Sequence, residues 1–205
     1  ERPALVAAKY VESSKTLQTL NMSIGFSHFS RREARTISLL VRALSRNTSV
    51  TKLSIMCDGV LNCISVSFRK FLTSTQTLQK LEIIGFANTA FDKMDTNAIV
   101  SGFASNTTLS DLKFQSWPEA DLAPALTALQ DHPALQKIHF SPSDEYADYF
   151  PLPSLSGLEV LLRSQDSKVK ELVLDKLDTR TVGLHPVLRE LERNTAVTTL
   201  AIRVS

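Results

Sequence analysis

One six-residue pattern recurs along the whole chain and constrains its fold more than any other feature. An apolar residue is followed by two variable residues, an apolar residue, one variable residue and a final apolar residue. The intervals between successive copies run from 26 residues (Leu109 to Leu135) to 34 residues (Leu135 to Val169), a spacing typical of solenoid repeats. The seven copies are Leu17-Leu20-Met22, Val50-Leu53-Ile55, Leu78-Leu81-Ile83, Leu109-Leu112-Phe114, Leu135-Ile138-Phe140, Val169-Leu172-Leu174 and Val197-Leu200-Ile202.

Each copy predicts a short strand that follows a helix. The last two apolar positions alternate with polar neighbours, which is the period of a strand with one buried face. Upstream of most copies, apolar residues recur at spacings of three and four, as in an amphipathic helix. We expect Pro124 and Pro186 in first helical turns, and Asp121 and Ser154 as N-caps. The segments with clear helical spacing are 33–47, 66–74, 121–132, 155–165 and 184–194.

One helix–strand unit cannot bury its own apolar stripe, so we expect the units to stack. Stacking places a parallel sheet on one side and a row of helices on the other. A closed α/β fold would need longer strands that are apolar on both faces. The sequence therefore predicts an α/β solenoid, curved into an arc, with about seven short strands on the concave side and helices on the convex side. The whole of 1–205 is one array of about seven repeats.

The L-x-x-L-x-L core behind a helix, with N-T-x-L at the helix–strand junction, resembles leucine-rich repeats. The long period resembles the ribonuclease-inhibitor-like class, and the resemblance extends from about Leu5 to Val204. It implies a binding scaffold rather than a catalyst. The chain departs from the family where an Asn or Cys is expected, three residues after the last strand position. Those positions hold Gly25, Asp58, Phe86, Trp117, Ser143, Leu177 and Ser205, so we expect no asparagine ladder there.

Side chains between the buried strand positions should point to the open face of the sheet. We expect Glu82 to lie beside Lys113, and Asp111 to lie between Lys80 and Lys137. Two interpretations remain open: a solvated face with weak cross-strand pairs, or a surface that binds a protein by charge complementarity. The candidate residues on this face are Lys52, Lys80, Glu82, Asp111, Lys113, Lys137 and His139.

The segments that follow the strands form a second candidate. Trp117 follows one strand, and Tyr146, Tyr149 and Phe150 lie in the longest break of the pattern. These aromatic residues either cover the edge of the core or form a protruding contact loop.

Composition excludes several other classes. The 23 basic and 21 acidic residues give a net charge of +2, too little to indicate nucleic acid or an anionic membrane. No apolar run is long enough to span a membrane. Cys57 and Cys63 make neither a disulfide framework nor a zinc site, and both free thiols and a local disulfide remain open. No catalytic, metal or cofactor motif is present, so we expect no enzyme activity and no cofactor.

The repeat pattern begins with a helix and ends with a strand, which predicts an open sheet edge after Ile202. We expect either a segment of a longer chain or an edge covered by another chain, in an oligomer or a larger assembly. The preferred function is protein–protein interaction without chemistry. The alternative is a regulatory or substrate-recognition module of an enzyme system, resembling a GTPase activator or a ubiquitin-ligase receptor. We expect a cytoplasmic location, with an extracellular one left open because the chain does not begin with Met.

Overall fold

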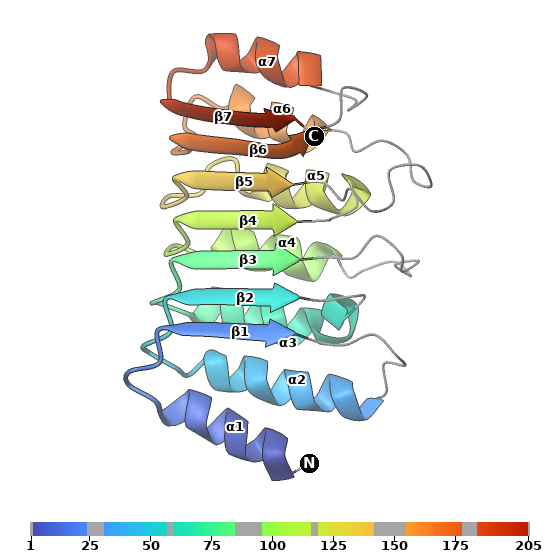
Figure 1. Ribbon diagram of the computed structural model, residues 1–205, viewed down its shortest axis with the longest axis vertical. Helices are drawn as coiled ribbons and strands as arrows, with labels where there is room; N and C mark the ends of the chain where they lie inside the picture. The colour runs from blue at the N-terminus through green and yellow to red at the C-terminus, as the bar shows by residue number, and fades with distance from the viewer. Residues whose placement is uncertain are drawn as a thin grey trace.

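A computed structural model describes residues 2–23, 31–56, 60–84, 96–115, 119–141, 155–177 and 184–204. Within them, helices and strands alternate along the chain (Figure 1). The helices are α1 Arg2–Ser13, α2 Arg31–Leu44, α3 Val60–Ser74, α4 Thr96–Ser105, α5 Glu119–Ala128, α6 Ser156–Arg163 and α7 Leu184–Arg193. The strands are β1 Thr19–Ser23, β2 Lys52–Met56, β3 Lys80–Ile84, β4 Asp111–Gln115, β5 Lys137–Ser141, β6 Glu171–Leu177 and β7 Thr199–Val204.

The strands form one parallel sheet in chain order, from β1 to β7. Figure 1 shows the helices on one side of this sheet, spread over a longer span than the strands. The array is therefore curved, with the sheet on the concave side and the helices on the convex side. This is an α/β solenoid of the leucine-rich-repeat type, and the predicted fold class is confirmed.

The strand register confirms the repeat pattern. The second apolar position of every copy lies in one row across the sheet, and the third lies in another. Leu53, Ile55 and Phe114 are completely buried in these rows. The prediction of burial is wrong for Leu200 and Ile202 of β7, which are 44% and 39% exposed, because among the described residues β7 pairs with a strand on one side only.

Aromatic side chains fill the middle of the core between the sheet and the helices. The rings of Phe68 and Phe71 lie 6.0 Å apart, and those of Phe103 and Phe114 lie 6.2 Å apart in an edge-on arrangement. Gly102 of α4 faces α3 so closely that a Cβ atom would lie 3.0 Å from Leu72 Cδ1. Small residues here let neighbouring helices approach, which makes the core continuous along the array.

Asparagine side chains tie successive repeats together where each helix turns into the next strand. Asn106 Oδ1 accepts hydrogen bonds from the backbone N–H groups of Thr108 and Leu109, at 3.0 and 2.8 Å. Its Nδ2 donates to the Leu72 carbonyl of the preceding repeat, at 2.7 Å. Asn47 and Asn194 make the equivalent bonds. These bonds satisfy backbone groups that a helix end leaves unpaired.

The expected absence of an asparagine ladder after the strands stays a prediction, but asparagine rungs do occur before them. Leu177 ends β6, and the other post-strand positions, 25, 58, 86, 117, 143 and 205, lie outside the described residues. The amide ladder stands at the opposite end of the strands, at Asn47, Asn106 and Asn194. The other three junctions between Asn47 and Asn194 use different acceptors. Thr75 and Ser167 each accept one turn N–H group, and His132 accepts two.

Two predicted helix starts are wrong. Helix α5 begins at Glu119, so Asp121 lies inside it and Pro124 lies in its second turn rather than its first. Ser154 lies outside the described residues, and Leu155 is the N-cap of α6 without a side-chain cap. Pro186 is the third residue of α7, as expected. Glu119 and Ala120 are good helix formers, so α5 extends two residues ahead of the aspartate that was expected to cap it.

Candidate functional site

The open face of the sheet carries two rows of side chains that the register brings together. One row contains Thr19, Lys52, Lys80, Asp111, Lys137, Glu171 and Thr199. The next row contains Asn21, Ser54, Glu82, Lys113, His139, Val173 and Ala201. The seven predicted residues from Lys52 to His139 thus lie on one surface, contributed by four adjacent strands.

Opposite charges on neighbouring strands pair with each other across this face. Lys80 Nζ lies 2.9 Å from Asp111 Oδ2, and Lys113 Nζ lies 2.7 Å from Glu82 Oε1. Lys137 Nζ lies 2.6 Å from Glu171 Oε1. The predicted neighbours of Glu82 and Asp111 are confirmed. Partly exposed pairs of this kind contribute about 0.2–1 kcal/mol each, so they position side chains more than they stabilise the fold.

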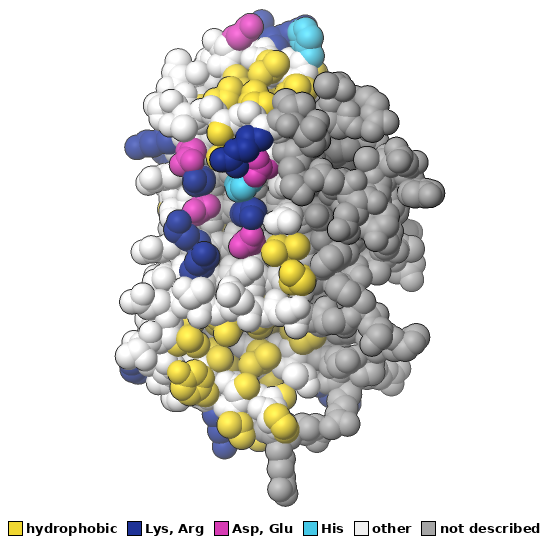
Figure 2. Space-filling model, in the orientation of Figure 1, with side chains coloured by type: hydrophobic (Ala, Val, Ile, Leu, Met, Phe, Trp, Pro, Cys, Tyr) yellow, Lys and Arg dark blue, Asp and Glu magenta, His cyan; other side chains and the backbone are white. Residues whose placement is uncertain are grey.

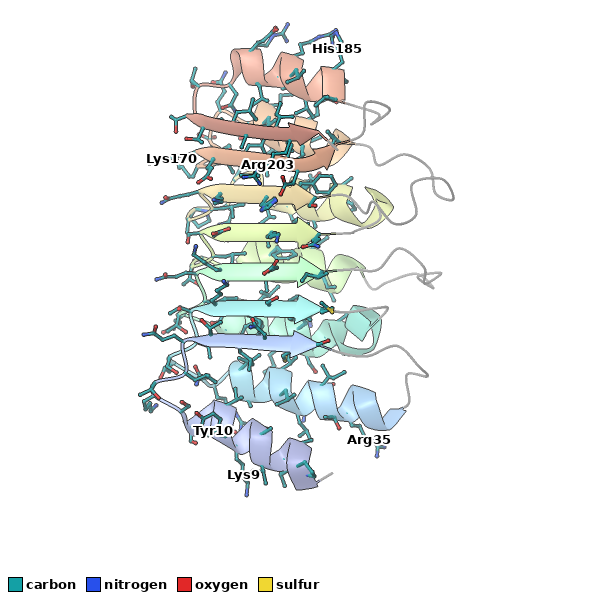
Figure 3. The ribbon with its side chains drawn as sticks, viewed as in Figure 1. Lys9, Tyr10, Arg35, Lys170, His185 and Arg203 are labelled. Carbon is teal, nitrogen blue, oxygen red and sulfur yellow. The ribbon has the colours of Figure 1, made fainter. Side chains whose placement is uncertain are left out.

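Asp175 joins three strands at one end of the charged band. It accepts hydrogen bonds from His139 Nε2 of β5, at 3.0 Å, and from Arg203 Nη1 of β7, at 3.0 Å. Figure 3 shows Arg203 lying over the sheet. Burial raises the pKa of Asp175, but the hydrogen bonds from Arg203 and His139 outweigh this effect and hold its pKa below the ordinary value. The carboxylate is therefore charged at neutral pH.

Sequence reasoning did not include Asp175 and Arg203 among the candidate residues. Asp175 follows Leu174 and Arg203 follows Ile202, so the alternation of inward and outward strand positions already indicated that both lie on the open face. They were missed because the candidates were taken from the middle of the array rather than from every outward strand position.

The first two strands carry a different surface. The outward residues of β1 are Thr19, Asn21 and Ser23, none of which is charged. Lys52 of β2 stands directly beside Lys80 of β3, and no carboxylate of a described residue pairs with it. Figure 2 shows the charged side chains gathered in a band over the middle of the sheet, with apolar surface toward both ends. Lys52 is thus a cation at the border of the paired band.

The other candidates cannot be placed on this face. Trp117, Tyr146, Tyr149 and Phe150 lie outside the described residues, as does Cys57. Cys63 belongs to α3, and its side chain is not among those described. Among the described residues, no group of three or more His, Cys, Asp or Glu side chains could hold a metal ion. Nor is any described helix sufficiently long and apolar to cross a membrane.

His132 is a buried histidine at a helix–strand junction. Its Nδ1 accepts hydrogen bonds from the backbone N–H groups of Ala134 and Leu135, at 3.3 and 3.1 Å. Its Nε2 is buried and has no hydrogen-bond partner among the described residues. Burial lowers the pKa of His132 below its ordinary value, and the Asn106 backbone raises it by less. The ring is therefore a neutral structural cap.

Comparisons with known proteins give a fold-level likeness only. No protein-family model matches the chain. No curated protein sequence matches it either. Among 14 solved chains that match is the tropomodulin C-terminal domain of Caenorhabditis elegans, with 10% identity, a TM-score of 0.49, and coverage of 93% of this chain and 94% of that chain. The leucine-rich-repeat type of fold rests on the seven in-register strands themselves.

Proposed function

We propose that this chain is a non-enzymatic protein-interaction module that binds a partner protein on the open face of its sheet. The observation that supports this proposal is the border between β2 and β3. There, an unpaired Lys52 and the uncharged side chains of β1 and β2 adjoin a band in which every strand carries paired charges. Within the leucine-rich-repeat type, we assign the chain to the ribonuclease-inhibitor-like class, and we place it in the cytoplasm.

Charge complementarity can act at Lys52 without breaking an existing contact. Each paired lysine on this face would have to give up its own carboxylate to bind an acidic group of the partner. Lys52 has no such competitor among the described residues. It lies beside Ser54 and Met56, which offer a hydroxyl and an adaptable apolar side chain. A partner that presents an acidic residue beside small apolar groups fits this surface best.

Photo-crosslinking tests which face binds. A photoreactive amino acid replaces Ser54 on the open face, and a matched variant carries it in place of Lys70, an exposed residue of α3 on the helical side. In lysate of the source cells, we expect the Ser54 variant to crosslink to a defined protein that the Lys70 variant does not capture. Crosslinking of the same protein from Lys70 alone would move the binding surface to the helices.

A charge reversal then measures the contribution of Lys52. Lys52→Glu removes a cation that no described carboxylate pairs with, and Lys70→Glu makes the same charge change on the opposite side. We expect Lys52→Glu to weaken binding of the crosslinked partner at least about fivefold, equal to about 1 kcal/mol. Lys70→Glu should leave the affinity unchanged. Equal effects of the two variants would contradict binding at the border between β2 and β3.

A further inference from the structure

The row of open-face side chains that contains Lys52 has more cations than carboxylates. Its lysines are Lys52, Lys80 and Lys137, and its acidic residues are Asp111 and Glu171. Lys80 pairs with Asp111, and Lys137 pairs with Glu171. The positive charge that remains is at Lys52, which is exposed and stands directly beside Lys80 in the register. A carboxylate that binds Lys52 therefore also reduces the repulsion between two neighbouring lysines.

The other end of the same two strands is apolar on the open face. Met56 of β2 and Ile84 of β3 are neighbours in the register, and both are half-buried. Figure 2 shows apolar side chains directly beside the charged band on this face. The flexible thioether of Met56 lets this small apolar area adapt to an aliphatic side chain of another molecule. β2 thus presents a cation at its first residue and an apolar contact at its last.

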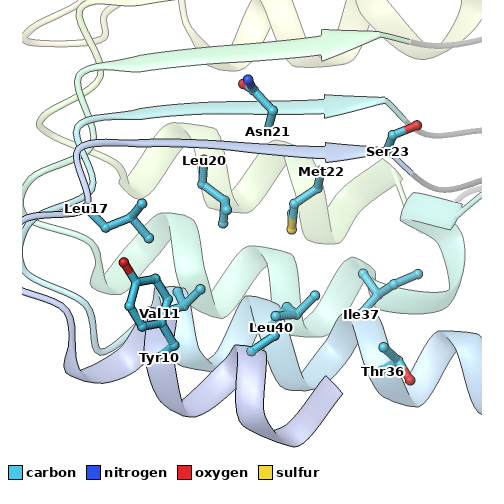
Figure 4. Close-up of a pocket in the computed structure, with 11 residues that line it drawn as sticks. Tyr10, Val11, Leu17, Leu20, Asn21, Met22, Ser23, Thr36, Ile37 and Leu40 are labelled. Carbon is cyan, nitrogen blue, oxygen red and sulfur yellow. The ribbon is translucent and has the colours of Figure 1, made fainter. Parts of the chain in front are cut away.

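Ser54 lies between these two contacts and has a shorter side chain than either neighbour in its row. Those neighbours are Asn21 of β1 and Glu82 of β3. Asn21 is exposed, and Figure 4 shows it on the side of β1 that faces away from the helices. Glu82 is bound to Lys113 at 2.7 Å. A partner segment can therefore approach the sheet most closely over Ser54.

The distance between the cation and the apolar contact sets the spacing that a partner must match. Lys52 and Met56 are four residues apart on one strand, which corresponds to about 13 Å at a rise of about 3.3 Å per residue. In an α-helix, seven residues span about 10.5 Å and make about two turns, so the first and last lie on one face. The flexible Lys52 side chain can cover the remaining difference of about 2–3 Å.

A helix fits this surface better than an extended segment because of its backbone hydrogen bonds. An extended segment that lies flat on the sheet needs partners for its backbone N–H and C=O groups. Next to β2 few groups are available for this purpose, since Lys80 and Glu82 already bind other residues. A helix satisfies its own backbone groups and contacts the surface through side chains alone. With a diameter of about 10–12 Å, it also covers β2 and a strand beside it.

We propose that the partner binds through an amphipathic helix that lies along β2. One face of this helix presents an acidic residue to Lys52, a small residue over Ser54 and a large aliphatic residue to Met56 and Ile84. The acidic and aliphatic residues are seven positions apart, and the small residue stands three or four positions from each. This inference rests on the protein-binding function proposed for the open face, and it adds the shape and the side-chain chemistry of the bound segment.

Photo-crosslinking from β1 measures the spacing without changing a residue that makes the contacts. A diazirine amino acid replaces Thr19, Asn21 or Ser23 in turn, which are the neighbours of the three open-face residues of β2. Mass spectrometry then locates the crosslinked residue of the captured partner. Between the Thr19 and Ser23 variants, we expect this residue to move by about seven to nine positions along the partner sequence.

Two other results of the crosslinking would each have a distinct meaning. An extended segment would move the crosslinked residue by about four positions over the same distance. That result would overturn the helix and leave binding on the open face intact. Failure to capture any protein from the three β1 positions and from Ser54 would overturn the binding function as well.

Substitutions in the partner segment test the helix and its charge separately. Proline at a residue that faces away from the sheet should weaken binding at least about tenfold, because it breaks a helix without removing a contact. Alanine at the same residue is the matched control and should leave the affinity unchanged. Lysine in place of the mapped acidic residue should weaken binding, and combination with Lys52→Glu should restore the affinity to within about twofold. Binding that tolerates proline, or a charge reversal that Lys52→Glu does not restore, would overturn the proposal.

Discussion

Two neighbouring helix–strand junctions meet the same structural demand with different side chains. At the junction after α4, Asn106 accepts two backbone N–H groups and also donates to the Leu72 carbonyl of the preceding repeat. At the junction after α5, His132 accepts the equivalent pair of N–H groups, but its Nε2 has no hydrogen-bond partner among the described residues. Closing a turn and tying one repeat to the previous one are therefore separate tasks. The imidazole performs the first, and its contact with the preceding repeat is limited to the Asn106 backbone, which influences its pKa without making a hydrogen bond of ordinary geometry.

A hydroxyl side chain two residues after the asparagine adds to the difference between the two junctions. Thr108 Oγ1 donates to the Leu78 carbonyl at 2.8 Å, and Thr77 and Ser49 make the equivalent bonds to the repeats before them. The residue at this position beside His132 is Ala134, which has no side-chain donor. The junctions before β2 and β4 are thus tied to the preceding repeat by two side chains, and the junction before β5 by neither.

The largest effect is expected from the loss of the asparagine. Asn106→Ala would leave two backbone N–H groups and the Leu72 carbonyl unpaired in the buried interior, at a cost of about 3 kcal/mol in the free energy of unfolding. Asn106→His copies the neighbouring junction and is the matched control. It should lose about half as much, because it retains an acceptor for the turn. Urea denaturation measures both, and equal losses would show that the tie between repeats contributes nothing.

The reverse exchange should stabilise the protein. His132→Asn should supply a donor for the Phe103 carbonyl, which lies three residues before Asn106 just as Leu72 lies three residues before Thr75. We expect a gain of about 1 kcal/mol at pH 8, measured from the urea midpoint at unchanged slope. A loss of stability would mean that the larger ring is needed to fill the space at this junction.

The difference in stability between the unsubstituted protein and His132→Asn should depend on pH. Because burial lowers the pKa of His132 in the folded state, the unfolded chain binds more protons as pH falls below about 6.5. The contribution of His132 to stability is thus complete above that pH and decreases below it. The advantage of His132→Asn should grow between pH 8 and pH 5, while titration of the carboxylates cancels in the difference. A difference that does not change with pH would contradict a neutral buried ring.

The sequence predicted the strands well because each one buries two alternating residues in the same core. It therefore also predicted the register and the side chains that meet on the open face, such as Glu82 and Lys113. Helix starts were less predictable, as Pro124 inside α5 demonstrates. Helix α4 carries no clear amphipathic pattern. Its packed face combines the buried Ile99 and Phe103 with Gly102, and the glycine leaves a gap in the apolar spacing.

Contacts between repeats were harder to predict than contacts within them. The N-T-x-L pattern marked the position of Asn106, but the carbonyl that it binds lies 34 residues earlier. Exposure of Leu200 and Ile202 depends on what lies beyond β7, a property that an apolar strand pattern does not encode. The partner of Lys52 is likewise absent from local sequence, so the candidate site could be located but its ligand could not.

The smallest effect in this comparison concerns the missing hydroxyl. Ala134→Thr adds a donor directly before Leu135, in the position that Thr108 occupies before Leu109. It should bind the Leu109 carbonyl and stabilise the protein by about 0.5 kcal/mol, near the lower limit for a neutral hydrogen bond. Ala134→Val has nearly the same shape without the hydroxyl and is the matched control. A double-mutant cycle with His132→Asn then decides whether the two ties act independently. If the gains in stability are additive, each hydrogen bond is made to its own carbonyl without help from the other. If Ala134→Thr stabilises the protein only together with His132→Asn, the histidine holds the junction out of reach of the preceding repeat.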